Sequence, residues 1–179
     1  MPLFESGRFT YGLSTMGCKA NLTDTQALEA RLCRMGGVAA EEDQVPDLFL
    51  LNTCTVTDQA DKEARLQLRK GKAAFTIATG CLAEVDPDQL KNVDLGDRRV
   101  KIVRNSAKDS LEQIVENWLD GQEQWKSPVE HGDRIGWHGK ILENRDRADP
   151  IAASSRTRAF YKVQDGCNAF CSYCVIPLA

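Results

Sequence analysis

Residues 45–54 have the sequence VPDLFLLNTC, an apolar run followed by Asn52, Thr53 and Cys54. A short continuous apolar run of this kind is typical of a strand that is buried in a sheet. Hydrophobic residues make up 42% of the 179-residue chain, so a packed core can form around such a strand. The run therefore predicts a buried strand that leads directly into a cysteine.

The same arrangement occurs twice more along the chain. The run Phe9–Thr15, rich in β-branched and aromatic residues, leads into Gly17 and Cys18, and the run Phe75–Thr79 leads into Gly80 and Cys81. A fourth strand is predicted at Arg99–Arg104 (RVKIVR).

Helical patterns separate these runs. Leu28, Leu32 and Met35 lie on one face of a helix that follows capping residues at 21–24, and Gly36-Gly37 ends it. Further helices are predicted after Thr57 or Asp58 through Lys72, from Asp86, and from Ser106 to Leu119.

Strands that alternate with helices indicate a parallel sheet with right-handed crossovers. We therefore predict an α/β fold, a three-layer parallel sheet flanked by helices of the Rossmann or flavodoxin type, for a domain at residues 1–120. Residues 121–157 are polar and are predicted to be a connector. The segment 158–164 (RAFYKVQ) predicts the first strand of a second domain, which begins at 158 and continues to 179.

Charge and composition exclude several classes of protein. The net charge of −3 does not suit a domain that binds nucleic acid alone, because phosphate contacts need clustered Lys and Arg. No stretch approaches the roughly 20 apolar residues that span a membrane, and the N-terminal residues lack the apolar core of an export signal. Seven cysteines in a cytoplasmic chain indicate metal ligands or catalytic thiols rather than disulfides.

Cys18, Cys54 and Cys81 each follow a predicted strand. The carboxyl ends of parallel strands lie along one edge of a sheet, so these cysteines are expected to meet there. The helix N-termini at this edge favour thiolates. Two alternatives remain: three small buried residues at strand ends, or a zinc site, for which no fourth ligand is evident.

Cys167, Cys171 and Cys174 form a C-x3-C-x2-C motif after the strand predicted at 158–164. Three thiolates on one loop would hold three irons of a [4Fe–4S] cluster and leave the fourth open to a small molecule. A zinc knuckle is the alternative for this motif. Cys33 fits neither set and is interpreted as a packing residue or a partly exposed thiol. Asn21 and Asn52 lie near the first set and are interpreted as turn-forming residues, with positioning of cluster sulfurs or hydrogen bonding to them as the alternative role.

The two cysteine sets, in this order, resemble the radical-SAM methylthiotransferase family. The local matches are TMGCKAN at 15–21, LNTCTVT at 51–57 and ATGC at 78–81, and the resemblance extends from about residue 9 to the end of the chain, weakly over 121–157. These motifs look most like the branch that acts on N6-threonylcarbamoyladenosine in tRNA. Other branches act on isopentenyladenosine in tRNA or on a ribosomal protein.

The resemblance implies a function and a set of cofactors. Cys167, Cys171 and Cys174 would hold the [4Fe–4S] cluster that binds and cleaves S-adenosylmethionine, with Tyr173 beside the adenine of that cofactor. A second [4Fe–4S] cluster, on the first cysteine set (Cys18, Cys54 and Cys81), would supply sulfur for a methylthio group at C2 of the adenosine next to the anticodon. The implied partners are tRNA and an electron donor such as flavodoxin or ferredoxin.

The length departs from this family, whose barrel needs roughly 200 residues or more. We therefore expect a truncated chain or a fragmentary gene product, which would not turn over S-adenosylmethionine alone and would lack most tRNA contacts. Two readings from other classes stay open: a non-catalytic iron–sulfur electron-transfer module, and a structural zinc protein.

Overall fold

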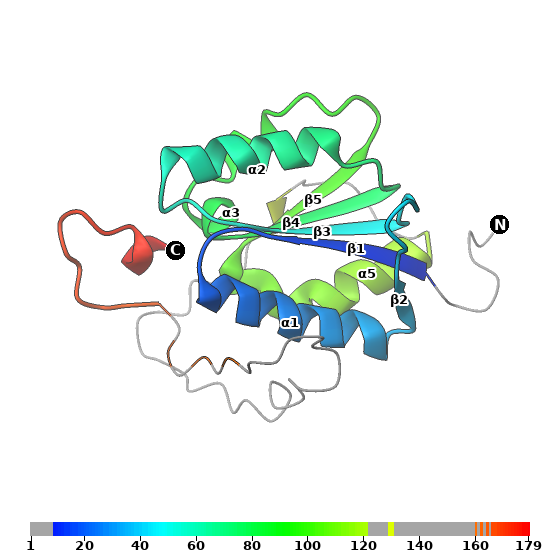
Figure 1. Cartoon of the computed structure of the whole chain (residues 1–179), viewed down its shortest axis with the longest axis horizontal. Coiled ribbons are helices and arrows are strands. Elements are labelled where there is room, and N and C mark those ends of the chain that lie inside the picture. Colours follow the sequence, from blue (N-terminus) through cyan, green and yellow to red (C-terminus); the bar gives the residue numbers. More distant parts are fainter. Residues whose placement is uncertain (1–8, 122–128, 131–159, 161, 163, 165) are drawn as a thin grey trace.

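The structure is a computed structural model that describes residues 9–121, 129–130, 160, 162, 164 and 166–179. Strands and helices alternate along most of this part of the chain (Figure 1). The strands are β1 (Phe9–Thr15), β2 (Gly37–Ala39), β3 (Leu48–Thr53), β4 (Phe75–Gly80), β5 (Arg99–Val103) and β6 (Val129–Glu130). The helices are α1 (Lys19–Arg34), α2 (Asp58–Lys70), α3 (Cys81–Val85), α4 (Asp88–Lys91) and α5 (Leu111–Leu119), with short 3-10 helices η2 (Asn105–Ser110) and η4 (Ile176–Leu178).

The strands form one sheet in the order β2-β1-β3-β4-β5-β6, and every neighbouring pair is parallel. Helix α1, which follows β1, lies on one face of the sheet, and α2, which follows β3, lies on the other (Figure 1). The predicted three-layer α/β fold is confirmed. The strand order reverses between β1 and β3, and open parallel sheets bind ligands at the carboxyl ends of their strands beside such a reversal.

One half of the core lies between the sheet and helices α1 and α5. Leu28 and Leu32 of α1 pack with alternate residues of β3, Leu48 and Leu50. From α5, the ring of Trp118 stacks on Phe75 with a centroid distance of 5.2 Å and meets Phe9 edge to face at 6.1 Å. These aromatic contacts fix the position of α5 under the strands.

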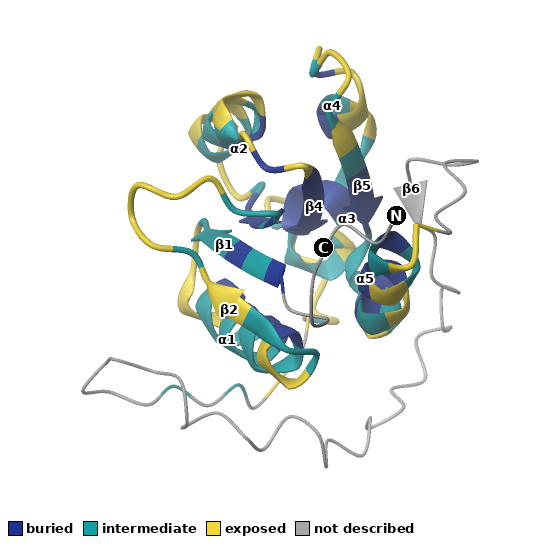
Figure 2. Cartoon of the chain, turned by 90° about the vertical axis from the view of Figure 1, so that its right-hand side faces the viewer, coloured by how far each residue is buried: buried dark blue, intermediate teal, exposed yellow. Residues whose placement is uncertain are grey.

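The other half of the core lies under α2, α3 and α4. Ala64 and Leu68 of α2 and Leu82 of α3 pack against the opposite face of the strands, which includes Leu51 and Ala78. Because both faces are covered, the central strands β3 and β4 are buried along most of their length, and Figure 2 shows buried strands with exposed outer helix faces.

The short elements that were not predicted include β2 and α3. Residues Gly37–Ala39 form the edge strand β2 beside β1, although Gly36-Gly37 indicated only a helix end. Helix α3 begins at Cys81 itself, directly after β4, although a helix was predicted only from Asp86. Both elements span five residues or fewer, too short for a periodic pattern to develop.

Most of the strand predicted at 158–164 lies outside the described residues. Phe160, Lys162 and Gln164 lie in irregular backbone. Residues 166–179 continue as a loop that lies at the carboxyl edge of the sheet, near the start of α1 (Figure 1). Most of the predicted connector 121–157 lies outside the described residues, although Val129–Glu130 within it adds β6 to the sheet.

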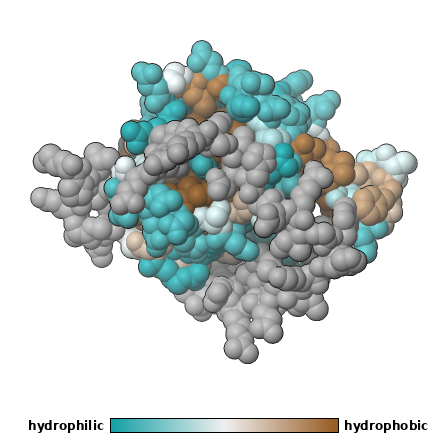
Figure 3. All heavy atoms as spheres, turned by 180° about the vertical axis from the view of Figure 1, so that it is seen from behind, coloured by the Kyte–Doolittle hydropathy of each residue, from teal (hydrophilic) through white to brown (hydrophobic). Residues whose placement is uncertain are grey.

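The back of the molecule is mostly hydrophilic, with separate apolar patches (Figure 3). Within the described part of the chain, none of the helices combines the length and apolar character needed to cross a membrane.

Candidate functional site

The first cysteine set lies at the ends of three adjacent strands. Cys18 caps the N-terminus of α1 just after β1, Cys54 follows β3, and Cys81 is the first residue of α3 after β4. Because β1, β3 and β4 are neighbours and parallel, the three residues share one edge of the sheet, beside the reversal of strand order. The expected convergence of these residues at one edge is present in the structure.

Two glycines allow the cysteine loops to approach each other closely. Gly17 has a φ of +84°, and a Cβ placed on it would lie 2.5 Å from Sγ of Cys54. Gly80 has a φ of +99°, and its Cβ would lie 2.5 Å from Oδ1 of Asn52. Both positions therefore need glycine for backbone conformation and for space.

The three thiols differ in exposure. Cys18 is exposed, whereas Cys54 and Cys81 are 4% and 9% exposed. Burial raises the pKa of the Cys81 thiol, and the neighbouring Cys54 and Cys18 raise it further, while Lys108 and Asn21 oppose this shift. Cys18 thus lies on the open side of the first cysteine set, and the other two thiols lie inside it.

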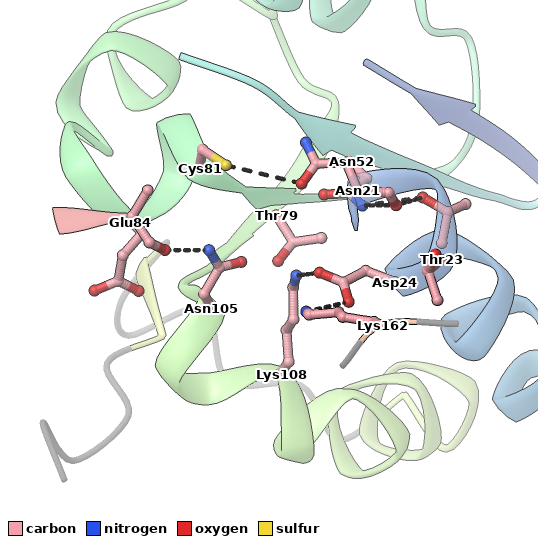
Figure 4. A network of polar contacts seen from close by, with 12 residues as sticks. Asn21, Thr23, Asp24, Asn52, Thr79, Cys81, Glu84, Asn105, Lys108 and Lys162 are labelled. Carbon is pink, nitrogen blue, oxygen red and sulfur yellow. Dashed lines mark hydrogen bonds and ion pairs between the residues drawn. The ribbon is translucent and has the colours of Figure 1, made fainter. Parts of the chain in front are cut away.

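A buried polar network lies beside these thiols (Figure 4). The side-chain amide of Asn21 donates to the backbone oxygens of Met16, at 3.0 Å, and Thr53, at 2.9 Å. The Cys81 thiol lies 3.8 Å from Oδ1 of Asn21. The amide of Asn52 donates to the backbone oxygen of Asn21 at 2.9 Å. The interpretation of both asparagines as turn-forming residues is wrong, since Asn21 lies in α1 and Asn52 in β3.

Two buried acceptors beside the network are not satisfied by the protein. Oδ1 of Asn52 and Oγ1 of Thr79 have no hydrogen-bond partner among the described residues. Asn52 and Thr79 are paired in the register of β3 and β4, so their side chains point to the same face of the sheet. Buried polar atoms without partners are costly, which is consistent with a polar occupant near this edge.

In the part of the chain that the structure describes, no three His, Cys, Asp or Glu side chains are grouped closely enough to hold one metal ion. Thiolates are the usual ligands of iron–sulfur clusters, which take one thiolate on each of several irons. Cys18, Cys54 and Cys81 are therefore the residues of this edge that could hold such a cluster.

The second cysteine motif occupies the loop at 166–179. Cys171 is exposed, and Cys167 and Cys174 are partly buried. The amide of Cys174 donates to the carbonyl of Cys171 at 3.0 Å, which closes a turn around the motif. The side chain of Tyr173 is 90% exposed, so it is available for contact with another group.

Contacts of Phe160, Lys162 and Ala179 link the C-terminal part of the chain to the α/β domain. Nζ of Lys162 lies 2.6 Å from Asp24 in α1, and Nζ of Lys19 lies 5.4 Å from the ring centroid of Phe160. The amide of Asn105 donates to the backbone oxygen of Ala179 at 2.5 Å. The segment with the second cysteine motif is thus held against the edge that carries the first set.

Cys33 lies away from both sets, near the end of α1. It is exposed, and its Sγ is 3.2 Å from the hydroxyl of Tyr11, in agreement with its interpretation as a partly exposed thiol. Burial raises the pKa of Tyr11, and the contacts with Cys33 and Glu29 raise it further, so this hydroxyl stays protonated.

Fold and site together define a class: a flavodoxin-like α/β domain that presents three cysteines along the carboxyl edge of a parallel sheet. Residues 10–100 match the family described as "Uncharacterized protein family UPF0004". The chain belongs to this family.

Its curated relatives include methylthiotransferases of three kinds. The chain is 34% identical to the threonylcarbamoyladenosine tRNA methylthiotransferase MtaB of Aquifex aeolicus, over 92% of the chain and 38% of that protein. It is 25% identical to the ribosomal protein uS12 methylthiotransferase RimO of Leptospira biflexa, over 94% of the chain and 37% of the relative. It is also 25% identical to the tRNA-2-methylthio-N(6)-dimethylallyladenosine synthase of Neorickettsia sennetsu, over 93% of the chain and 36% of the relative.

The resemblance to methylthiotransferases that the sequence motifs predicted is thereby confirmed. The chain spans 38% or less of the length of each of these three relatives.

Proposed function

We propose that this chain forms part of a methylthiotransferase that adds a methylthio group to C2 of N6-threonylcarbamoyladenosine in tRNA, next to the anticodon. The identity of 34% to an MtaB enzyme, against 25% to the RimO and dimethylallyladenosine relatives, supports this branch. The activity is proposed for the whole protein, in which residues 1–120 form the N-terminal domain, 121–157 the connector, and 158–179 the start of the radical-SAM domain.

Cys18, Cys54 and Cys81 are the proposed ligands of an auxiliary [4Fe–4S] cluster. The observation that carries this proposal is their position at the ends of three adjacent parallel strands. The burial of Cys54 and Cys81 keeps water from two of the thiolates, and the exposure of Cys18 leaves that side open to an approaching substrate.

Cys167, Cys171 and Cys174 are the proposed ligands of a second [4Fe–4S] cluster, which binds S-adenosylmethionine at its open iron. When bound, the two clusters and S-adenosylmethionine supply the radical, sulfur and methyl chemistry. The exposed ring of Tyr173 offers an aromatic face on which the adenine of S-adenosylmethionine can stack. The contacts of Lys162 with Asp24 and of Lys19 with Phe160 hold this segment near the first set.

The proposed partners follow from the reaction. The substrate is tRNA, and an electron donor such as flavodoxin or ferredoxin reduces the cluster, so the protein is placed in the cytoplasm. Because the chain carries a net charge of −3, we assign most phosphate contacts with tRNA to other parts of the protein.

Anaerobic reconstitution of the purified chain with iron and sulfide tests the cluster assignment. We expect about eight irons per chain, four for each cluster, and an electron paramagnetic resonance spectrum that shifts when S-adenosylmethionine is added. Cys18→Ala should remove about half of the iron and leave the part of the spectrum that responds to S-adenosylmethionine. Cys33→Ala is the matched control and should keep all of the iron.

Other outcomes identify the competing functions. Clusters whose electron paramagnetic resonance spectrum does not change when S-adenosylmethionine is added would favour a non-catalytic electron-transfer module. A purified chain that contains zinc and no iron would favour a structural zinc site. Loss of both clusters in Cys18→Ala would contradict two independent sites.

A further inference from the structure

We propose that Asn21 is a positioning residue that holds the three loops of the first cysteine set in a fixed arrangement. Its side chain is 4% exposed and contacts each loop. The amide donates to Met16, two residues before Cys18, and to Thr53, directly before Cys54, while the thiol of Cys81 lies beside its carbonyl oxygen.

The chemistry of an asparagine side chain suits this position. Its amide nitrogen carries two hydrogens, which match the two backbone oxygens at 3.0 and 2.9 Å, and its oxygen can accept from a thiol. An aspartate of the same size would turn an acceptor toward those two oxygens and add a negative charge beside Cys81. A serine or alanine would lack the second donor and would not span the loops.

Neighbouring residues hold Asn21 itself in place. Its backbone oxygen accepts from Nδ2 of Asn52 at 2.9 Å and from Oγ1 of Thr25 at 3.0 Å, and both residues are buried. Figure 4 shows Asn21, in the first turn of α1, next to Asn52 of β3 and on the same side as Asp24 and Lys108. The arrangement links α1 and β3 directly to the three cysteine loops.

It follows that the spacing of the three thiols is set by the protein before any metal binds. That this spacing serves an iron–sulfur cluster rests on the proposed function. That Asn21 holds the three cysteine loops in place does not rest on it. Alkylation of the metal-free protein therefore tests the restraint alone, because a buried thiol reacts only when its surroundings open.

The experiment compares the rates at which Cys54 and Cys81 react with N-ethylmaleimide in the folded, metal-free chain, measured by mass spectrometry. In Asn21→Ala we expect both rates to rise about tenfold, because two buried hydrogen bonds that close the loops are lost. The rate at Cys33, at the other end of α1, should not change and serves as an internal reference. Asn21→Asp keeps the volume of the side chain and should also speed the reaction at Cys54.

Val115→Ala is the control for general loss of stability. Val115 of α5 is fully buried in the core between the sheet and the helices and is not part of the polar network beside the cysteines. A rise in Asn21→Ala no larger than in Val115→Ala would overturn the proposal, since it would reflect general loss of stability.

Reconstitution with iron and sulfide gives a second readout. In Asn21→Ala, the spectrum of the cluster on the first set should shift or disappear while the cluster that responds to S-adenosylmethionine remains. An unchanged spectrum from the first set would contradict the proposal. If the unaltered chain binds no cluster at Cys18, Cys54 and Cys81, the proposed function fails, and the alkylation rates still decide the role of Asn21.

Discussion

At the scale of single residues, the site depends on glycine where the chain turns from β4 into α3. Gly80 has a φ of +99° and a ψ of −166°, a region that residues with a side chain rarely adopt. A Cβ there would also lie 2.3 Å from the backbone oxygen of Thr53. One residue therefore allows Cys81 to sit beside the loop that carries Cys54.

Gly80→Ala should lower the free energy of unfolding by about 1–3 kcal/mol, because alanine is strained in this backbone conformation. The overlap of its Cβ with the backbone of Thr53 should lower the free energy of unfolding further. Gly96→Ala is the control, because Gly96 also has a positive φ, +58°, but a Cβ there meets nothing within 4 Å. Urea unfolding of the two variants measures the difference. Equal losses of stability would show that the close approach at Gly80 carries no extra cost.

At the scale of elements, the helices that follow β1, β3 and β4 each begin next to a cysteine loop. Helix α2 starts after Thr57, whose hydroxyl accepts from the amide of Ala60 at 3.2 Å, and Asp58 and Asp61 lie in its first turn. This confirms Thr57 as the cap. The acidic side chains also interact favourably with the positive end of the helix dipole.

Thr57→Ala should destabilise the protein by about 1 kcal/mol, because the first turn of α2 loses its side-chain acceptor. Thr57→Ser keeps the hydroxyl and should stay within a few tenths of a kcal/mol of the unaltered chain. Urea titration followed by circular dichroism gives both values. A loss that is just as large in Thr57→Ser would contradict the capping role and point to the methyl group instead.

At the scale of the whole molecule, one carboxylate joins three distant parts of the chain. Asp24 of α1 lies 3.0 Å from Nζ of Lys108 in η2 and 2.6 Å from Nζ of Lys162 in the C-terminal segment. Burial acts to raise the pKa of Asp24, but the two ammonium groups outweigh it, and the pKa is lowered below its ordinary value. The ion pairs therefore contribute to stability as long as Asp24 is ionised.

Asp24→Asn should cost about 1–3 kcal/mol at pH 7, since hydrogen bonds to a charged group are lost and two lysines face each other. Because the pKa of Asp24 is lower in the folded state, its contribution is fully present above the ordinary carboxyl pKa of about 4. It disappears as the pH falls through the folded value. We therefore expect the urea unfolding midpoints of Asp24→Asn and of the unaltered chain to differ most at pH 7. The two midpoints should converge as the pH is lowered to 2.5.

Asp88→Asn is the control for this comparison. Asp88 forms an exposed pair with Lys91 at 3.6 Å, and such pairs contribute little. A gap between Asp24→Asn and the unaltered chain that widened in acid would contradict the lowered pKa.

The fold class and the candidate ligands could be predicted from the order of residues along the chain. The apolar runs at 48–53 and 75–80 could be recognised as strands because both faces of a central parallel strand are buried. Cys18, Cys54 and Cys81 could be placed at one edge from the chain direction alone, since all parallel strands end on the same side.

The groups that surround those cysteines could not be predicted from the sequence and became visible in the folded chain. Asn21 meets Thr53, which is 32 residues away, and Cys81, which is 60 residues away, so no local pattern reveals these contacts. Helix α3 is buried by its neighbours and strand β2 pairs with β1, although each element is too short for a periodic signal. A sequence pattern indicates which residues favour a helix or a strand and which are buried. Hydrogen bonds between loops depend instead on distances that are set when the sheet assembles.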